Sequence, residues 1–239
     1  MYAGIGQING FVYCTAPNLN YFVGSTIMGS WMTVCSLAVV LALDRCLSVT
    51  FEKLQIFLFD GWRVNVWIFI CVLEGVLFTL FTAPIFYNGH LLTFYIDPFA
   101  TYGFTDEVEY SSYILNINNI AIGIVLFVIY IIFSSVFAYN YFIRHKKTLT
   151  ASLRNPVVSL FCTVFVYSSV LTAASLLYMV SQMITASRYF IIFSTIIGIS
   201  SYGLNGIIYL LLNPSLRRTV FNLRIFNWGG YSVSQYPHS

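Results

Sequence analysis

Five long apolar stretches, separated by polar segments, set the pattern of this chain. Each is longer than the roughly 20 residues that an α-helix needs to cross a bilayer at about 1.5 Å per residue. Strands of an outer-membrane barrel would show alternating hydrophobicity, and the chain has no such alternation. In hydrocarbon a helix satisfies its own backbone groups, so the pattern predicts an all-α membrane protein, a helical bundle. The five predicted transmembrane helices cover approximately residues 21–43, 64–86, 118–142, 157–181 and 189–212.

The composition places this bundle in lipid. Hydrophobic residues account for 59% of the 239 residues, charged residues for 8%, and the mean hydropathy is +0.81. A soluble fold of this length could not bury so much apolar surface. The net charge of +3 is too small to indicate nucleic-acid binding, so the lipid bilayer is the expected partner.

The basic residues predict the orientation of the bundle. Ten of the eleven Lys and Arg residues fall in the stretches 45–63, 144–154 and 217–224. The stretch 87–111 has no basic residue and carries four carboxylates. Basic residues are retained on the cytoplasmic side of a membrane. We therefore expect the three basic stretches and the C-terminus to be cytoplasmic, and the acidic stretch to be an outer loop.

A short helix on the membrane surface is expected after the last span. Asn213 and Pro214 have the character of an N-cap followed by proline at the first helical position. Apolar residues then face one side and arginines the other, a pattern typical of helices that lie on a membrane. We expect a transmembrane domain over 1–226, with its surface helix over 214–226, and a cytoplasmic tail over 227–239.

Three motifs lie at the predicted cytoplasmic ends of two spans. Asp44-Arg45-Cys46 closes the first span, and Asn205-Gly206-Ile207-Ile208-Tyr209 comes late in the last span. Tyr209 then leads through three leucines to Asn213 and the basic segment. Together the motifs resemble the third, seventh and eighth helices of rhodopsin-like G-protein-coupled receptors. That family has an aromatic residue at the place of Cys46 and a proline at the place of Gly206.

A closer resemblance is to the nematode serpentine chemoreceptors of class T. It is carried by Gly10-x-x-Tyr13-Cys14-x-x-Pro17, by Gly24 and Trp31, by the run Leu-Ala-Leu-Asp-Arg-Cys that ends at Cys46, and by Asp97-Pro98-Phe99. The resemblance covers Gly10 to about Arg218. In that family two helices precede this signature. It therefore implies a seven-helix architecture of which this chain lacks the first two helices.

The resemblance implies a chemosensory receptor for small organic ligands that couples to a heterotrimeric G protein. It implies a plasma-membrane location, in sensory cilia for the family, and we expect a five-helix form to be retained in the endoplasmic reticulum. Arg45 would be the G-protein contact, restrained at rest by Asp44. The alternative for this pair is a simple boundary ion pair, and for Asn205 and Tyr209 ordinary interhelical contacts. The residues expected to serve coupling are Asp44, Arg45, Asn205, Tyr209, Arg144, Lys146 and Lys147.

The outer halves of the helices are the expected ligand chamber. Their aromatic and Met side chains with few polar groups suit small organic molecules, and plain bundle packing is the alternative for each residue. By its offset from Arg45, Ile27 occupies the place where amine receptors carry an acid, which argues against an amine ligand. The residues expected to line the chamber are Ile27, Met28, Trp31, Glu74, Asn118, Asn119 and Thr195.

Glu74 lies at the middle of the second span, the depth at which a charge is most costly. One interpretation is structural, a protonated carboxyl bonded to a Ser or Asn of a neighbouring helix. The other is a role in ligand binding or proton transfer. The sequence leaves both open.

Other function classes find little support in the residues. The chain has no catalytic motif, no paired Cys or His spacing typical of a metal site, and no cofactor motif, so we expect neither an enzyme nor a metal or cofactor. A transporter or channel would show an internal repeat and several ionisable groups within the membrane. A non-signalling truncated receptor product is the third alternative. The stretch 87–111 has no cysteine, so the disulfide that usually tethers this loop in rhodopsin-like receptors cannot form there.

Overall fold

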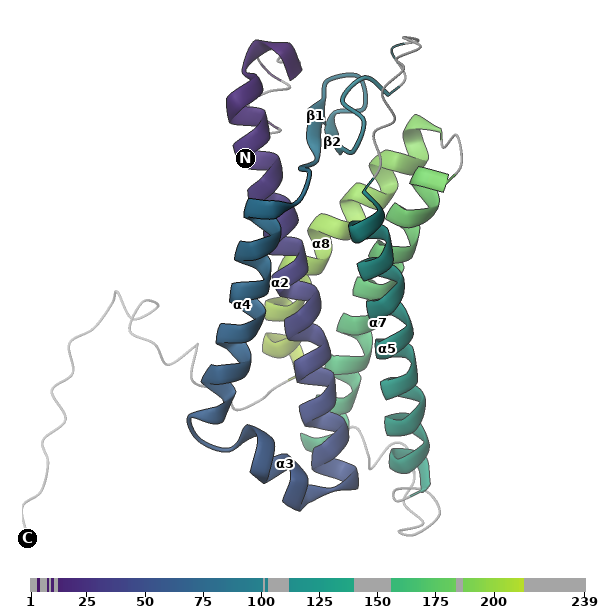
Figure 1. The fold of residues 1–239 in the computed structure, drawn as a ribbon. Coiled ribbons are helices and arrows are strands. Elements are labelled where there is room, and N and C mark those ends of the chain that lie inside the picture. The colour runs from purple at the N-terminus through teal and green to yellow at the C-terminus, as the bar shows by residue number, and fades with distance from the viewer. Residues whose placement is uncertain are drawn as a thin grey trace, which may run out of the picture.

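Figure 1 shows the computed structural model as a bundle of long helices with a small hairpin at one end. It describes residues 13–100, 112–139, 156–183 and 187–212, together with the single residues 4, 8, 10 and 102. The side chains at 49, 137, 156–164, 182, 183, 204, 205, 208, 209, 211 and 212 lie outside this description.

Five long helices make up the bundle, and the expected all-α membrane fold is confirmed. They are α2 (Pro17–Thr50), α4 (Arg63–Phe81), α5 (Tyr113–Ala138), α7 (Pro156–Met183) and α8 (Arg188–Leu212). Among the described residues three helices are long and apolar enough to cross a membrane, over Pro17–Ser48, Arg63–Phe81 and Tyr113–Val136. That α7 and α8 also cross stays a prediction. The predicted surface helix over 214–226 lies outside the described residues.

The short elements lie at the two ends of the bundle (Figure 1). One end carries the 3₁₀ turn η1 (Tyr13–Thr15) and an antiparallel hairpin of β1 (Phe86–Asn88) and β2 (Thr93–Tyr95). The opposite end carries α3 (Glu52–Phe59), which follows α2 after a single residue. We call these the hairpin end and the α3 end.

Two helices end at residues that differ from the predicted span ends, and the differences change the picture. The first span was expected to end at 43, but α2 continues to Thr50, so Asp44 and Arg45 lie within a helix. Polarity alone does not end a helix, because its backbone bonds form regardless of side-chain type. The second span was expected to reach 86, but α4 ends at Phe81, and Thr82 is already extended. Pro84 explains the early end, since proline and the residue before it disfavour helix.

The remaining helix starts lie close to their predicted places. Pro156 begins α7, the first-turn position expected from its missing N–H group. α5 starts at Tyr113, earlier than the expected 118. The segments that join α5 to α7 and α7 to α8 fall mostly outside the described residues.

The hairpin was not predicted, and a buried asparagine holds its turn. Phe86 pairs with Tyr95 and Asn88 with Thr93. The Asn88 side-chain oxygen accepts hydrogen bonds from the N–H groups of His90 and Leu91, both at 2.9 Å. Its amide nitrogen donates to the Ala100 carbonyl at 2.9 Å. An Asn that bonds its own turn in this way stabilises a reversal without a long strand pair.

Two apolar clusters fill the bundle interior. The α3-side cluster joins α2, α5 and α7 and contains Cys35, Ala38, Ala42, Cys46, Ile122, Leu126, Ile129, Phe133, Tyr167 and Leu171. The hairpin-side cluster contains Met28, Met32, Ile85, Ile96 and Leu115. Trp31 packs against both clusters, so it marks the level at which they meet.

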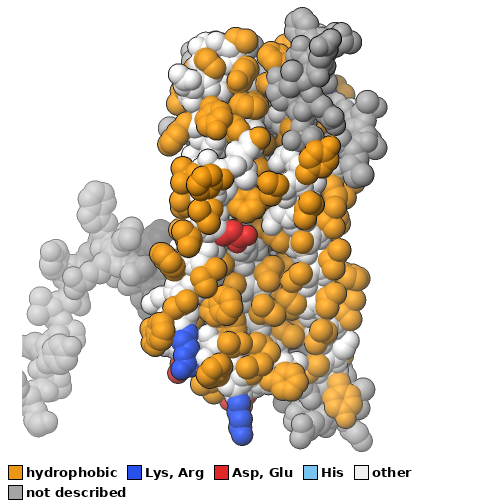
Figure 2. All heavy atoms as spheres, viewed as in Figure 1, with side chains coloured by type: hydrophobic (Ala, Val, Ile, Leu, Met, Phe, Trp, Pro, Cys, Tyr) orange, Lys and Arg blue, Asp and Glu red, His pale blue; other side chains and the backbone are white. Residues whose placement is uncertain are grey.

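The outside of the bundle is rich in large apolar side chains. Figure 2 shows hydrophobic side chains over most of the visible height, with basic side chains near the α3 end. Phe69 and Leu80 on α4 and Phe127 on α5 are each more than 60% exposed. Exposing so many large apolar side chains to water would be costly in free energy, so this surface suits contact with lipid.

The helices α2 and α4 approach each other closely at a pair of glycines. A Cβ added at Gly75 would lie 2.6 Å from the carbonyl oxygen of Gly29 and would meet the Thr33 hydroxyl. A Cβ added at Gly29 would in turn meet the Thr79 hydroxyl and the Gly75 carbonyl oxygen. Thr33 and Thr79 donate to the glycine carbonyls of their own helices, at 3.0 and 2.9 Å. Small residues at such contacts let helix backbones approach closely in membranes.

Candidate ligand chamber and coupling site

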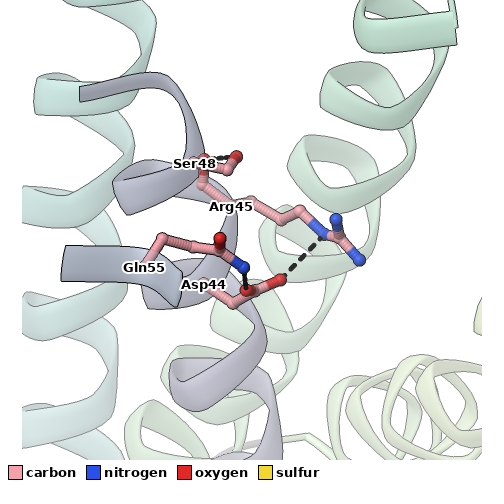
Figure 3. A network of polar contacts seen from close by, with 4 residues as sticks. All are labelled: Asp44, Arg45, Ser48 and Gln55. Atoms are coloured by element: carbon pink, nitrogen blue, oxygen red, sulfur yellow. Dashed lines mark hydrogen bonds and ion pairs between the residues drawn. The ribbon is translucent and has the colours of Figure 1, made fainter. Parts of the chain in front are cut away.

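At the α3 end an ion pair joins the two neighbouring residues of the Asp-Arg motif. Arg45 Nε lies 3.4 Å from Asp44 Oδ2, and the two side chains are 32% and 16% exposed. The second carboxylate oxygen, Asp44 Oδ1, accepts a hydrogen bond of 2.8 Å from Gln55 Nε2 on α3. Ser48 Oγ donates to the Arg45 carbonyl at 2.8 Å. Figure 3 shows Gln55 and the Arg45 guanidinium on opposite sides of Asp44.

This arrangement leaves Arg45 held by a weak interaction. A partly exposed ion pair contributes about 0–1 kcal/mol, because water and counterions screen it. Sequence reasoning expected Asp44 beside Arg45 but missed Gln55. In one continuous helix a residue eleven positions further on would lie about 16 Å along the axis from Asp44. Only the turn between α2 and α3 brings the two side chains together.

Toward the hairpin end, Trp31 connects three helices. Its indole N–H donates to Asn119 Oδ1 on α5 at 3.0 Å. Its ring meets the ring of Tyr202 on α8 edge-on, with centroids 6.2 Å apart. Asn119 is 1% exposed. Met28 belongs to the hairpin-side cluster next to it, and Ile27 packs against that cluster. The structure therefore brings four of the expected chamber residues together.

A cleft of about 200 Å³ lies on the α3 side of Trp31. Tyr167 of α7 and Tyr202 of α8 form one wall. The other wall belongs to α2 and consists of Val34, Leu37, Ala38 and Leu41. For scale, an engineered apolar cavity of about 150 Å³ in another protein holds benzene. The cleft can therefore accommodate a small organic molecule.

Sequence reasoning placed the chamber only in the outer helix halves and missed this cleft. Its α2 wall continues the helical spacing that starts at Ile27 and Trp31, so the stripe itself was visible. Whether that stripe of residues lines a cleft depends on how α7 and α8 pack against α2.

Comparison with known families identifies the chain. A family model described as the serpentine-type 7TM GPCR chemoreceptor Srt matches residues 1–228. The chain belongs to the Srt family of serpentine chemoreceptors. No curated protein and no solved structure matches it. The class T resemblance is confirmed, and the Srt chain is a multi-pass membrane protein from a chemoreceptor family and not from an enzyme family.

The hairpin of this Srt receptor is hydrogen-bonded to α7 and α8 at the hairpin end of the bundle. Thr93 Oγ1 donates to Thr195 Oγ1 on α8 at 3.1 Å, and Tyr95 OH donates to the Ser181 carbonyl of α7 at 2.7 Å. Burial raises the pKa of the Tyr95 phenol, the hydrogen bond to Ser181 offsets part of this rise, and Asp97 adds to it, so Tyr95 stays a neutral donor. Thr195, expected in the chamber, is therefore a hairpin contact. Residues 86–100 contain no cysteine, so polar contacts and packing hold the hairpin.

Glu74 lies in the contact between α4 and α2 and is not among the described residues that line the cleft. Ser36 Oγ donates to Glu74 Oε2 at 2.5 Å. Glu74 occupies the middle of α4 among mostly apolar residues. Of the two interpretations of Glu74, this geometry matches the structural one, a carboxyl bonded to a serine of a neighbouring helix.

The other expected site residues are placed as follows. Asn118 is half-buried on α5, about 100° around the helix from Asn119. Asn205 and Tyr209 lie one turn apart in α8, and their side chains are not described. Arg144, Lys146 and Lys147 fall outside the described residues. Within the part of the chain that is described, no three His, Cys, Asp or Glu side chains form a group that could hold a metal ion.

Proposed function

We propose that this Srt receptor binds small organic molecules in the cleft beside Trp31 and signals to a heterotrimeric G protein at its α3 end. The contacts of Trp31 carry the proposal. This one side chain bonds α5 through Asn119 and contacts α8 through Tyr202, which lines the cleft. A ligand that displaces this ring changes how three helices meet.

The α3 end supplies the other half of the proposal. In this proposal Arg45 leaves Asp44 to contact the G protein, and Gln55 remains as a hydrogen-bond partner for Asp44. The weak Asp44–Arg45 pair suits a switch, because a contribution of about 0–1 kcal/mol is small enough for ligand binding to reverse. Asn205, Tyr209, Arg144, Lys146 and Lys147 complete the proposed coupling surface. The cytoplasmic position of this surface, and a plasma-membrane location in sensory cilia, belong to the same proposal.

Nucleotide exchange on purified heterotrimeric G proteins, measured with membranes that contain the full chain, tests the coupling. Asp44→Asn keeps an acceptor for Gln55 but removes the charge that holds Arg45. Basal exchange should rise by up to about fivefold, which corresponds to about 1 kcal/mol. Arg45→Ala should reduce exchange to the level of membranes without receptor.

Arg63→Ala is the matched control. Arg63 lies near the same end of the bundle, and its guanidinium donates to the backbone of α3 at Phe57. Arg63→Ala removes one positive charge, as Arg45→Ala does, but leaves the Asp44–Arg45 pair intact, so nucleotide exchange should stay unchanged. Equal exchange by Arg45→Ala, Arg63→Ala and the unmodified receptor would show that Arg45 is only an interfacial anchor.

A further inference from the structure

Three buried polar groups lie where the two apolar clusters meet, and none has a hydrogen-bond partner among the described residues. They are Asn119 Nδ2 on α5 and the hydroxyls of Ser175 and Tyr178 on α7. Asn119 and Ser175 are 1% and 0% exposed. Buried polar atoms without a partner are rare in native proteins, because each costs about 1–3 kcal/mol.

These groups belong to one layer of the bundle. Asn119 lies one helical turn from members of both clusters, and Ser175 is placed in the same way on α7. Tyr178 packs against the hairpin-side cluster one turn beyond Ser175. Trp31, which packs against both clusters, borders the layer from α2 through its hydrogen bond to Asn119. Its ring also contacts Tyr202, which lines the cleft, so the layer and the cleft adjoin at Trp31.

The chemistry of the layer is that of a hydrogen-bond donor site. An indole N–H can only donate, so the Asn119 oxygen must face Trp31, and the two amide N–H groups remain unused. The Ser175 and Tyr178 hydroxyls can each donate as well. The described basic residues lie near helix ends, at Arg45, Lys53, Arg63 and Arg188, so no described charge is available here to pair with an anion.

We propose that this layer receives the accepting oxygen of an uncharged ligand, such as a ketone, an aldehyde or an ester. The apolar part of the ligand occupies the cleft lined by Tyr167 and Tyr202. This inference rests on the proposed function, because it assumes that the cleft beside Trp31 holds the ligand. It goes further by naming the ligand's chemical class.

A neighbouring serine shows what a purely structural polar contact looks like in this bundle. Ser168 lies on the same helix as Ser175 and is 1% exposed, but its hydroxyl accepts a hydrogen bond of 2.7 Å from Tyr130. Ser168 and Ser175 therefore lie on the same helix and are similarly buried, but of the two only the Ser168 hydroxyl has a hydrogen-bond partner among the described residues. They form a matched pair for mutation.

Binding of cyclohexanone and cyclohexane to the full chain in lipid nanodiscs tests the inference. The two probes match in size and ring shape and differ in one accepting oxygen. Ligand-observed NMR titration, with empty nanodiscs subtracted, gives the dissociation constant of each probe. We expect cyclohexanone to bind about tenfold more tightly, the effect of one or two hydrogen bonds. Ser175→Ala and Tyr178→Phe should each reduce this preference severalfold, whereas Ser168→Ala should leave it unchanged.

The outcomes separate this inference from the proposed function. Equal binding of both probes would overturn the donor layer and leave the cleft as a ligand site. Absence of binding by either probe would also overturn the inference, while the exchange assay on Arg45 still decides coupling. A loss of preference in Ser168→Ala as large as in Ser175→Ala would attribute the effect to packing and would equally overturn it.

Discussion

Replacing Gly75 by alanine should push α2 and α4 apart. The new Cβ would lie 2.6 Å from the Gly29 carbonyl oxygen, a separation that real Cβ atoms essentially never show. The carbonyl belongs to the α2 backbone and cannot rotate away, unlike the Thr33 hydroxyl that the Cβ also meets. To reach an ordinary contact of 3.4 Å, the two helices must separate by about 0.8 Å at this point.

The expected cost follows from the packing on either side of the glycines. Overfilling a well-packed contact typically costs about 1–3 kcal/mol. For a chain of this size that corresponds to a fall in melting temperature of roughly 2–12 °C. The adjacent Ser36–Glu74 hydrogen bond would lengthen as well, because it crosses the same interface. Thr33→Ala added to Gly75→Ala should restore only part of the loss, since the Gly29 carbonyl remains.

Gly198→Ala is the control, because the same substitution should have the opposite sign there. Gly198 lies within α8, and an added Cβ would meet nothing within 4 Å. Alanine in a helix interior stabilises by about 0.5–1 kcal/mol relative to glycine. The assay is thermal unfolding of the purified chain in lipid nanodiscs, followed by circular dichroism. If Gly75→Ala melts at or above the temperature of the unmodified chain, the close α2–α4 contact is not present in the membrane.

Two further predictions concern the hairpin and the orientation. Because the folded-state pKa of Tyr95 is raised above its ordinary value of 10.0, the folded chain keeps this proton more tightly than the unfolded chain does. The contribution of Tyr95 to the free energy of unfolding should be constant below about pH 10 and fall above it. Tyr95→Phe should remove this part of the loss of stability at alkaline pH, as measured by melting curves recorded at a series of pH values. For orientation, a glycosylation site engineered within 88–109 should be modified in microsomes and one within 144–154 should not; modification of the second site alone would reverse the proposed topology.

The sequence by itself determined the helices and the family. Apolar length sets which segments can enter the bilayer, and a helix in lipid must satisfy its backbone within its own segment, so each helix is a local decision. Pro156 shows this for a helix start. Pro84 shows it for a helix end, because proline disfavours a helix interior and would have predicted that α4 ends before residue 86. The class T motifs are also features of the linear sequence. They were sufficient to identify the family because they depend on the order and spacing of residues.

The side-chain pairs were decided by tertiary structure alone. Trp31 and Asn119 are 88 residues apart, and Ser36 and Glu74 are 38 apart. Helices in lipid are apolar on nearly every side, so hydrophobic periodicity does not specify how each one is rotated or how deep it sits. Only packing against neighbours sets that rotation. For this reason the sequence could name Trp31, Asn119 and Glu74 as candidates, but only the fold could pair Trp31 with Asn119 and Glu74 with Ser36.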